Sequence, residues 1–356
     1  MTSVRSSLSI LSLTLLLCTG IACSPGGGGA SGPKMRMASL QNKAGKFIEP
    51  TIASGQKALG AAKLPDNLIL WVSDPAGEES YPIVTYTWII AYKKYADVQK
   101  ATALKDVLAY CLTDGQKVSE SLGYLPLPKD VCDKVKAALE NIKGEGDAKG
   151  DAKVRLQGAG ASFPAPLYSK WFKQYNVAHP EVQIDYQSVG SGAGVKTVID
   201  KTGDFGASDA AMSDEEIAKV DVGAQLLPMT AGSIVLAYNL PGVDHLKLTR
   251  DAYVGIFLGK ITKWNDKAIA DANPGVALPD RDINVVVRSD GSGTTFVFTK
   301  HLSSINEEFA KSPGTDKQPN WPVGTKAKGN EGVAAAIKST PGSFGYLEYG
   351  YVKNEK

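Results

Sequence analysis

Three Gly/Ser-rich turns in this sequence have the composition of a site for a small anion. They are "GAGASFPAP" (158–166), "VGSGAG" (189–194) and "SDGSGTT" (289–295), and each precedes a helical pattern. Glycine lets the backbone approach a ligand closely, and the first N–H groups of a helix attract negative charge. Helix capping alone would explain one such turn. Three of them in one chain favour a site for a compact oxyanion.

The turns also carry small hydroxyls, which can cap a helix or donate to the same anion. These hydroxyls belong to Ser162, Ser191, Ser292 and Thr294. Arg288 ends the stretch "INVVVR" just before the third turn, where it can fork two hydrogen bonds onto an oxyanion. Asp290 is spaced to hold that guanidinium in place. An ordinary surface pair of Arg288 and Asp290 is the alternative.

Asp209 lies in "FGASDAAMSDEE", after a short apolar stretch and before a helix start, where capping is the commoner role of aspartate. If Asp209 faces an anion instead, the ligand must carry a proton, because two bare negative charges in contact repel. Hydrogenphosphate has such a proton and sulfate does not. A buried acceptor that finds no donor is penalised, so Asp209 would discriminate between these two ions.

Other chemistries lack their motifs in this sequence. There is no G-x-x-x-x-G-K-[ST] loop, and "GASDA" (206–210) lacks the last glycine of a nucleophile elbow. The three histidines and four cysteines show no metal spacing. The net charge of +2 gives no support for a nucleic-acid partner. We therefore expect no nucleic acid, no metal and no cofactor.

Short β-branched stretches alternate with helical patterns, which is typical of α/β architecture with mainly parallel strands. The expected strands are 85–93, 182–188, 233–240 and 283–289, and the expected helices are 97–112, 294–305 and 331–339. Cys111 falls on the apolar stripe of the first of these helices, so we expect it to be buried. A disulfide between Cys111 and Cys132 is an alternative in an oxidising compartment.

The first 34 residues have the pattern of an export leader followed by a tether. Arg5 precedes the apolar run "LSILSLTLLL" (8–17), which is too short to span a bilayer as a mature helix. Cys23 resembles the acceptor cysteine of a bacterial lipoprotein, although leucine is more usual where Gly20 stands. Plain leader cleavage is the alternative.

The stretch 144–153, "GEGDAKGDAK", has no large apolar residue and is expected to be a linker. Before it, "LPKDVCDKVKAALENIK" (127–143) trails off into lysine and glycine, as final helices often do. After it, "VRLQGAGASFP" (154–164) reads like the first strand and turn of a mature protein. Both flanks of the linker therefore look like chain ends.

With these residues in view, the chain closely resembles the phosphate-binding proteins of bacterial ABC-type phosphate importers. The resemblance extends over 37–356 except for the linker, and its motifs include "GAGASFPAPLYSKWF", "YQSVGSGAGVK", "DFGASDAAMSDEE", "GIFLGKITKWND", "VVRSDGSGTTFVFT" and "KGNEGVAAAIKSTPGSFGYLEY". In that family the block from 154 opens the mature chain and "GYLPLPKDVCDKVKAAL" closes it. Here the closing block comes first, so the chain looks like a circular permutant. An engineered permutant such as a phosphate-sensor scaffold is the simplest explanation, and a natural one is the alternative.

The resemblance implies an α/β, two-lobed periplasmic-binding-protein fold of type II, with a mixed sheet and flanking helices in each lobe. One lobe would be 84–230, including the linker, and the other would combine 35–83 with 231–356, with crossovers near 81–85 and 227–232. It implies a monomer that binds inorganic phosphate without converting it and delivers it to an ABC-type permease. It also implies a periplasmic protein, with Cys23 as the lipid anchor. The alternative is a secreted alkaline-type phosphatase of the same fold.

The resemblance also gives the site residues their roles. The hydroxyls of Ser162, Ser191, Ser292 and Thr294 and the backbone N–H groups of Phe163 and Gly293 would donate to phosphate. Arg288 would neutralise charge, Asp209 would accept the ligand proton, and Asp290 would orient Arg288. One departure is Gly203, where the family usually has valine. Loss of that side chain would cost about 1–4 kcal/mol if the position is packed, and would loosen the strand that ends at Asp209.

Overall fold

The fold is taken from a computed structural model that describes residues 35–60, 63–146 and 153–354. These described residues belong to one compact unit. The expected leader, its Cys23 and most of the expected linker lie outside the described residues. None of the described helices is both long enough and apolar enough to cross a membrane.

The strands of this unit form one nine-stranded mixed sheet and two small ones, with the order β13-β12-β14-β10-β4-β9-β7-β8 in the large sheet and β1 beside β10. The strands are β1 (Arg36–Met37), β2 (Ser39–Gln41), β3 (Phe47–Ile48), β4 (Val84–Tyr92), β5 (Lys94–Tyr95), β6 (Lys143–Gly144), β7 (Val154–Gly160), β8 (Val182–Ser188), β9 (Phe205–Ser208), β10 (Ala224–Asn239), β11 (Lys247–Leu248), β12 (Asn284–Arg288), β13 (Thr325–Ala327) and β14 (Ser343–Glu348).

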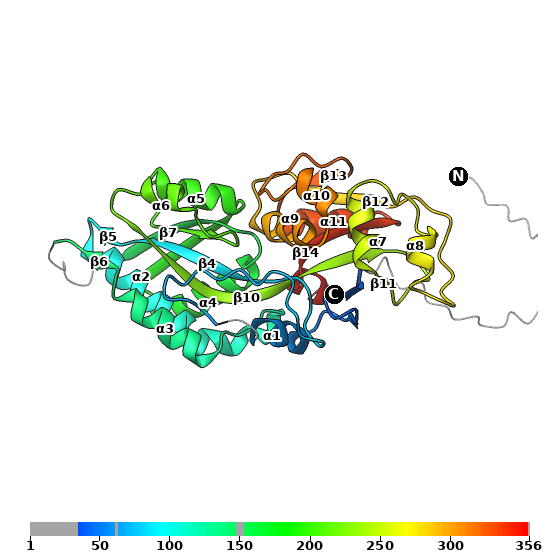
Figure 1. The fold of residues 1–356 in the computed structure, drawn as a ribbon. Coiled ribbons are helices and arrows are strands. Elements are labelled where there is room, and N and C mark those ends of the chain that lie inside the picture. The colour runs from blue at the N-terminus through cyan, green and yellow to red at the C-terminus, as the bar shows by residue number, and fades with distance from the viewer. Residues whose placement is uncertain (1–34, 61–62, 147–152, 355–356) are drawn as a thin grey trace, which may run out of the picture. The chain divides into compact units, whose positions relative to one another are not determined.

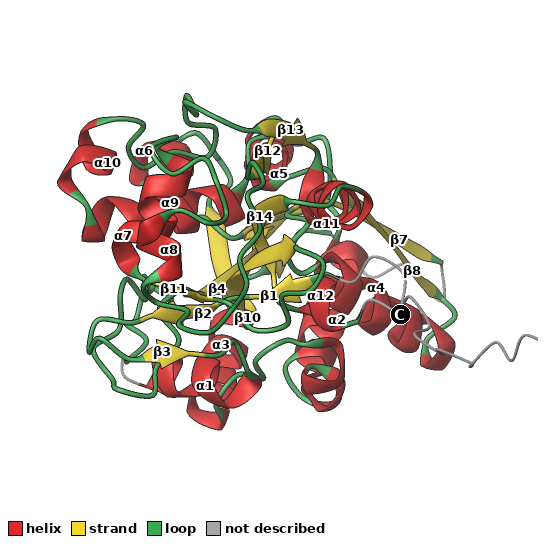
Figure 2. Ribbon diagram, turned by 90° about the vertical axis from the view of Figure 1, so that its right-hand side faces the viewer, coloured by secondary structure: helices red, strands yellow, loops and turns green. Residues whose placement is uncertain are grey.

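Helices cover this sheet on both faces, as Figures 1 and 2 show. They are α1 (Ile52–Gly60), α2 (Val98–Cys111), α3 (Lys129–Leu139), α4 (Ala165–Ala178), α5 (Ser191–Ile199), α6 (Asp214–Ala218), α7 (Arg250–Phe257), α8 (Lys267–Ala270), α9 (Gly293–Ile305), α10 (Glu307–Lys311), α11 (Gly329–Ser339) and α12 (Gly350–Lys353), with 3-10 turns at Asp114–Val118 and Glu120–Leu122. The α/β class predicted from the alternation of patterns is therefore confirmed.

The longest strand, β10, joins two groups of elements. Its residues 224–233 pair with β4, and its residues 234–239 pair with β14. On one side of this change lie β4, β7, β9 and helices α2 to α6, and on the other lie β12, β14 and helices α7 to α11 (Figure 1). The register against β4 shifts between Pro228 and Thr230, within the expected crossover 227–232.

The expectation of mainly parallel strands is wrong at the centre of the sheet. β10 runs antiparallel to β4, β14 and β1, and β4 runs antiparallel to β9, whereas the outer pairs β7–β8 and β12–β13 are parallel. A long strand shared by two groups enters the second group without a crossover helix, so it can pair antiparallel there. Local sequence patterns carry no information about this pairing.

Most of the expected elements lie within one or two residues of the observed ones. The strand β8 has the predicted bounds, while 233–240 proved to be only the second half of β10. The helices α2, α9 and α11 match the three predicted helices, and Asp97 and Ser292 cap the first two with side-chain hydrogen bonds. Cys111 is buried on α2 as expected, and both Cys111 and Cys132 are free thiols.

The described beginning of the expected linker is ordered structure. Lys143–Gly144 forms β6, which pairs in parallel with β5. The next residue continues the contact, since Glu145 N donates to Tyr95 O at 2.9 Å and Glu145 O accepts from Val98 N at 3.2 Å. A Cβ at Gly144 would overlap Val98, so glycine is required there for packing. The prediction that 144 onward is only a tether was therefore wrong for these residues.

The Gly203 position leaves no void of valine size. A Cβ at Gly203 would stand 2.8 Å from Thr197 Cγ2 and 3.0 Å from Gln157 O, closer than packed carbon atoms approach. The carbonyl of Gly203 also accepts a 2.9 Å hydrogen bond from Tyr92 OH. The expected loosening by a lost valine does not apply, because neighbouring atoms already fill the space.

Candidate anion site

The three Gly/Ser turns each lead into a helix, and the fold brings them together. Ser162 lies just before α4, Ser191 opens α5, and Ser292 is the N-cap of α9. The strands β7, β8 and β12 end where these turns begin, so the sheet positions all three. The eight predicted ligand residues are all buried, namely Ser162, Phe163, Ser191, Asp209, Arg288, Ser292, Gly293 and Thr294.

The second and third turns touch through their main chains. Gly192 N donates to Gly291 O at 2.8 Å. A Cβ at Gly190, whose φ is +99°, would overlap Asp290 Oδ2, and a Cβ at Gly293 would overlap Ser191 Oγ. Glycine is needed at these positions because only backbone without side chains can come this close. The turns therefore face each other across a narrow polar strip, the seam, which includes the eight predicted ligand residues.

Asp209 is the acidic centre of this seam and is 1% exposed. Its Oδ1 accepts from Thr87 Oγ1 at 2.9 Å, and its Oδ2 accepts from Thr294 Oγ1 at 3.3 Å and from Ser191 Oγ at 3.5 Å. Burial raises the pKa of Asp209 to about 6, although these hydroxyls and the charge of Arg288 oppose the rise. The alternative of a helix N-cap is wrong, because Ser213 caps the following helix.

Arg288 supplies the positive charge and is held by Asp290 as predicted. Arg288 Nε donates to Asp290 Oδ1 at 2.8 Å and Arg288 Nη2 donates to Asp290 Oδ2 at 2.5 Å, which is a bidentate pair. Burial alone would lower the pKa of Arg288, but Asp290 raises it. The side chain of Arg288 is 2% exposed, so a plain surface pair is excluded. Arg288 Nη1 also reaches Thr294 Oγ1 at 3.5 Å.

Three further residues that sequence reasoning missed lie at the site. Thr87 on β4 donates to Asp209, and Asn330 on α11 donates from Nδ2 to Ser162 Oγ at 2.9 Å and to Thr294 Oγ1 at 3.2 Å. Glu348 at the end of β14 gives its N–H to Asn330 Oδ1 at 2.9 Å. The only available signal was an asparagine after glycine at a helix start in "KGNEG", which reads equally well as a cap.

Glu348 is a buried carboxyl behind the site. Its Oε1 accepts from Gly350 N at 2.8 Å, and its Oε2 is one of the buried polar atoms that have no hydrogen-bond partner among the described residues. Burial raises the pKa of Glu348 well above its usual value, and the charge of Asp209 adds to the rise. The raised pKa favours the neutral form of Glu348, which places no second negative charge beside the anion site.

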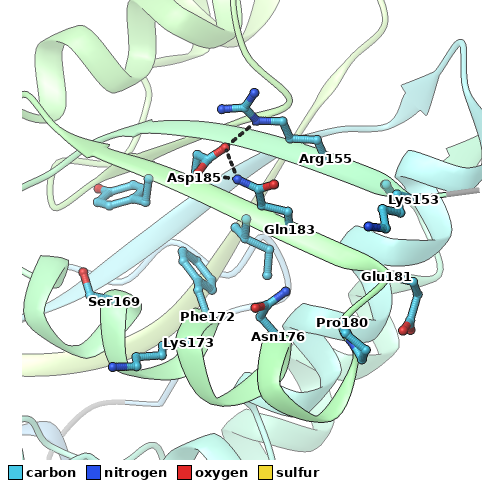
Figure 3. Close-up of a pocket in the computed structure, with 13 residues that line it drawn as sticks. Lys153, Arg155, Ser169, Phe172, Lys173, Asn176, Pro180, Glu181, Gln183 and Asp185 are labelled. Atoms are coloured by element: carbon cyan, nitrogen blue, oxygen red, sulfur yellow. Dashed lines mark hydrogen bonds and ion pairs between the residues drawn. The ribbon is translucent and has the colours of Figure 1, made fainter.

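A separate cavity of about 670 Å³ lies between α4 and β8 and contains none of the predicted site residues (Figure 3). Its one internal ion pair joins Arg155 Nε to Asp185 Oδ2 at 2.5 Å, and Gln183 turns to the same carboxylate. Exposed lysines such as Lys153 and Lys173 line its rim. Nothing in it converges on a small anion as the buried seam does.

The seam offers hydrogen-bond donors, one guanidinium and one carboxylate, all buried from solvent. That combination can hold a small tetrahedral anion that carries a proton, because the carboxylate needs a donor and every other group gives one. Among residues 35–60, 63–146 and 153–354, no three His, Cys, Asp or Glu side chains are grouped as metal ligands.

Comparisons with known proteins agree with this chemistry. A family model described as a PBP superfamily domain matches residues 147–356. The phosphate-binding protein PstS of Xylella fastidiosa, strain Temecula1, is 45% identical over 205 residues, which cover 57% of this chain and 56% of that protein. The PstS protein of Pasteurella multocida is 47% identical over 205 residues, covering 56% and 58% respectively. The matched part thus spans somewhat more than half the length of these curated relatives.

Among solved structures, the phosphate binding protein of Stenotrophomonas maltophilia matches with a TM-score of 0.41 and 22% identity. The match covers 55% of this chain and 60% of that protein.

Proposed function

Because this chain belongs to the PBP superfamily, we propose that it binds inorganic phosphate, as hydrogenphosphate, and delivers it to an ABC-type permease. The relatives named PstS are phosphate-binding proteins, and the buried seam of this chain has the chemistry that such a ligand requires. Ser162, Phe163, Ser191, Ser292, Gly293 and Thr294 would donate to its oxygens.

The observation that carries the proposal is the environment of Asp209. This carboxylate is buried among hydroxyls and lies near a guanidinium, so a bound dianion can approach it only by offering a proton. Hydrogenphosphate does so, whereas sulfate would leave Asp209 facing a bare negative oxygen. The contact between Thr294 and Asp209 would give way to contacts of each with the ligand.

Titration calorimetry with phosphate and with sulfate tests the proposal. We expect tight binding of phosphate at pH 8 and binding of sulfate at least about a hundredfold weaker. With sulfate, the buried carboxylate of Asp209 has no proton to accept and also repels a negative oxygen of the ligand. Equal affinities would contradict the role given to Asp209. Failure to bind either ion would contradict the proposed function.

We propose that the ligand is bound without chemical conversion, as the names of the relatives suggest. The hydroxyls of the site bond to Asp209, Asn330 or backbone groups, and in this proposal Asp209 accepts the proton of the ligand and not that of a nucleophilic hydroxyl. Incubation with a chromogenic phosphate ester checks this. Release of the chromophore that Ser162→Ala abolishes would instead identify a phosphatase.

Two lobes, 84–230 and 35–83 plus 231–356, are part of the proposal. Contacts between them support a closed arrangement around the site: Asn330 reaches Ser162, Gly192 reaches Gly291, and Lys317 Nζ pairs with Glu216 Oε1 at 3.1 Å. The strand β10 and the residues before β4 would serve as the crossovers. Phosphate-dependent compaction in small-angle scattering would support a hinge, and an unchanged profile would contradict it.

We further propose that the order of the segments is permuted. The strand β4, which precedes the linker, lies between β9 and β10, which follow it. Met35 and Val352 line the same surface pocket, so a direct link between the two segments would be short. A chain that starts at Val154 and joins Lys353 to Met35 should then fold and bind phosphate with unchanged affinity. A misfolded product would contradict the permutation.

We also propose that the protein is an exported, periplasmic monomer, lipid-anchored through Cys23. The support is the leader-like pattern of 1–34 together with the PstS relatives. Mass spectrometry after bacterial expression tests the anchor, since lipidation adds a diacylglyceryl mass that Cys23→Ser removes. A protein that gains no such mass has no lipid anchor at this residue.

A further inference from the structure

Within the described part of the chain, Asn330 is the one side chain at the seam with hydrogen bonds to both the first and the third turn. It is the second residue of α11 and is 0% exposed. Its Oδ1 accepts the N–H of Glu348 at 2.9 Å, and a backbone N–H can only donate. This contact fixes the orientation of the amide, so the two hydrogens of Nδ2 point to Ser162 Oγ and Thr294 Oγ1.

The contacts of Asn330 determine whether the hydroxyl of Ser162 can donate or accept a hydrogen bond toward the ligand. Ser162 Oγ accepts from Asn330 N at 3.0 Å and from Asn330 Nδ2 at 2.9 Å. A hydroxyl has two acceptor positions and one proton, so both acceptor positions of Ser162 are filled. The O–H bond of Ser162 therefore points in another direction, so Ser162 can bond to an anion only as a donor.

The hydroxyl of Thr294 is also held as a donor. Its Oγ1 lies 3.2 Å from Asn330 Nδ2 and 3.5 Å from Arg288 Nη1, and both groups can only donate. Its proton therefore points to Asp209 Oδ2, which lies 3.3 Å away. Without Asn330, either hydroxyl could rotate and accept a proton from a ligand.

We propose that Asn330 is a positioning residue that selects the protonation state of the bound anion. Because it makes the hydroxyls of Ser162 and Thr294 donors only, neither hydroxyl can accept a proton from the ligand, whereas the carboxylate of Asp209 can. A phosphate with one proton can place that proton on Asp209, and the second proton of a doubly protonated phosphate finds no acceptor at either hydroxyl. This inference rests on the proposed function and adds a preference for hydrogenphosphate over dihydrogenphosphate.

The experiment compares Asn330→Asp with the unaltered protein by phosphate calorimetry between pH 5.5 and 8.5. An ionised carboxylate at position 330 accepts protons where the amide donated them, so both hydroxyls turn away from the ligand. We expect phosphate affinity at pH 8 to fall about a hundredfold, since two hydrogen bonds of about tenfold each are lost. We expect the variant to bind relatively better at low pH, opposite to the unaltered protein.

Other ionisable groups also face this site, and the comparison with the unaltered protein separates their titration from that of position 330. They are Glu348 on β14, Asp209 after β9, Arg288 on β12 with Asp290 two residues beyond it, Tyr351 on α12 and Tyr124, while the exposed Glu331 on α11 acts on Tyr351 through its charge. All of them are retained in the variant. In a protein that already carries Ser162→Ala, Asn330→Asp should cause a smaller loss of phosphate affinity, because one of the two redirected hydroxyls is then absent.

Asn273→Asp is the matched control. Asn273 is a buried asparagine whose Nδ2 also donates to two acceptors, the carbonyls of Lys247 and Ile269, away from the seam. We expect it to lower thermal stability without changing phosphate affinity or its pH profile. Should Asn330→Asp not fold, Asn330→Ala answers the same question, with an affinity loss of about tenfold and a weaker dependence on pH.

The outcomes separate the inference from the proposed function. If the unaltered protein does not bind phosphate, the proposed function fails. If the unaltered protein binds phosphate and the Asn330 variants keep its affinity, or lose affinity equally at every pH, the role given to Asn330 is overturned and the residue only supports packing.

Discussion

Replacing Asp209 with asparagine separates two effects that the buried carboxylate combines. The amide has nearly the same shape, so it keeps an oxygen for Thr87 and adds an N–H group. In the unliganded protein it removes the cost of burying a charge. In the liganded protein it removes the one group that requires a proton on the anion.

The first effect has a magnitude that follows from the pKa of Asp209, which burial raises from 3.8 to about 6. A rise of about two units corresponds to about 3 kcal/mol, at 1.36 kcal/mol per unit. Because the pKa is higher in the folded state, that state binds more protons between about pH 4 and pH 6, and stability falls as pH rises through this window. Asp209→Asn has no such fall.

The assay is urea unfolding of both proteins at pH 4 and at pH 8, in buffers without phosphate. The difference in unfolding free energy, variant minus unaltered, should be about 2.5 kcal/mol more favourable at pH 8 than at pH 4, because an unfolded-state carboxyl with a pKa of 3.8 is already partly ionised at pH 4. This double difference cancels any cost of the substitution that does not depend on pH. The same difference at both pH values would show that burial does not raise the pKa of the Asp209 carboxyl.

The second effect is measured by calorimetry at pH 8. An amide can turn its N–H group toward a bare oxygen, so sulfate should bind the variant better than it binds the unaltered protein. Phosphate should bind less tightly, and the ratio of the two affinities should fall at least about tenfold. An unchanged ratio would show that Asp209 does not read the ligand proton.

Three further substitutions test other parts of the argument. Arg288→Ala should lower phosphate affinity by at least about 1.5–3 kcal/mol in calorimetry, since it removes a charged donor and leaves Asp290 buried without its partner; an affinity within twofold of the original would contradict this. Glu348→Gln should gain stability relative to the unaltered protein as pH rises above 4.5, because the pKa of Glu348 is higher in the folded state; chemical unfolding at pH 4 and pH 8 would detect the trend or its absence. Gly203→Val should lower stability by about 1–3 kcal/mol through crowding against Thr197, and a rise in melting temperature would show instead that the position has room.

The sequence could predict the site to the extent that local patterns describe it. The turns at Ser162, Ser191 and Ser292 were found because glycine, hydroxyls and a helix start are adjacent in the chain. Arg288 and Asp290 were found because their pairing spans two residues. The structure places these groups together, with the three serines and Arg288 buried and Asp290 partly buried.

Asn330 and Thr87 could not be found in this way. Thr87 lies within an apolar strand pattern 122 positions from Asp209, and Asn330 lies 168 positions from Ser162. Their roles depend on the order of strands in the sheet, which places β4 beside β9 and β14 beside β10. Sequence periodicity predicts the face that a residue occupies, but not which distant strand that face meets.

The glycines of the seam have a consequence for the size of ion that fits. Gly190 and Gly293 lie so close to Asp290 Oδ2 and Ser191 Oγ that a Cβ would overlap those atoms, and Gly192 lies against the main chain of Gly291, so the turns are already in close contact. A wider tetrahedral oxyanion such as molybdate would therefore have to be accommodated by moving whole turns apart. The size of the ion that fits is therefore limited by how far apart the turns can stand.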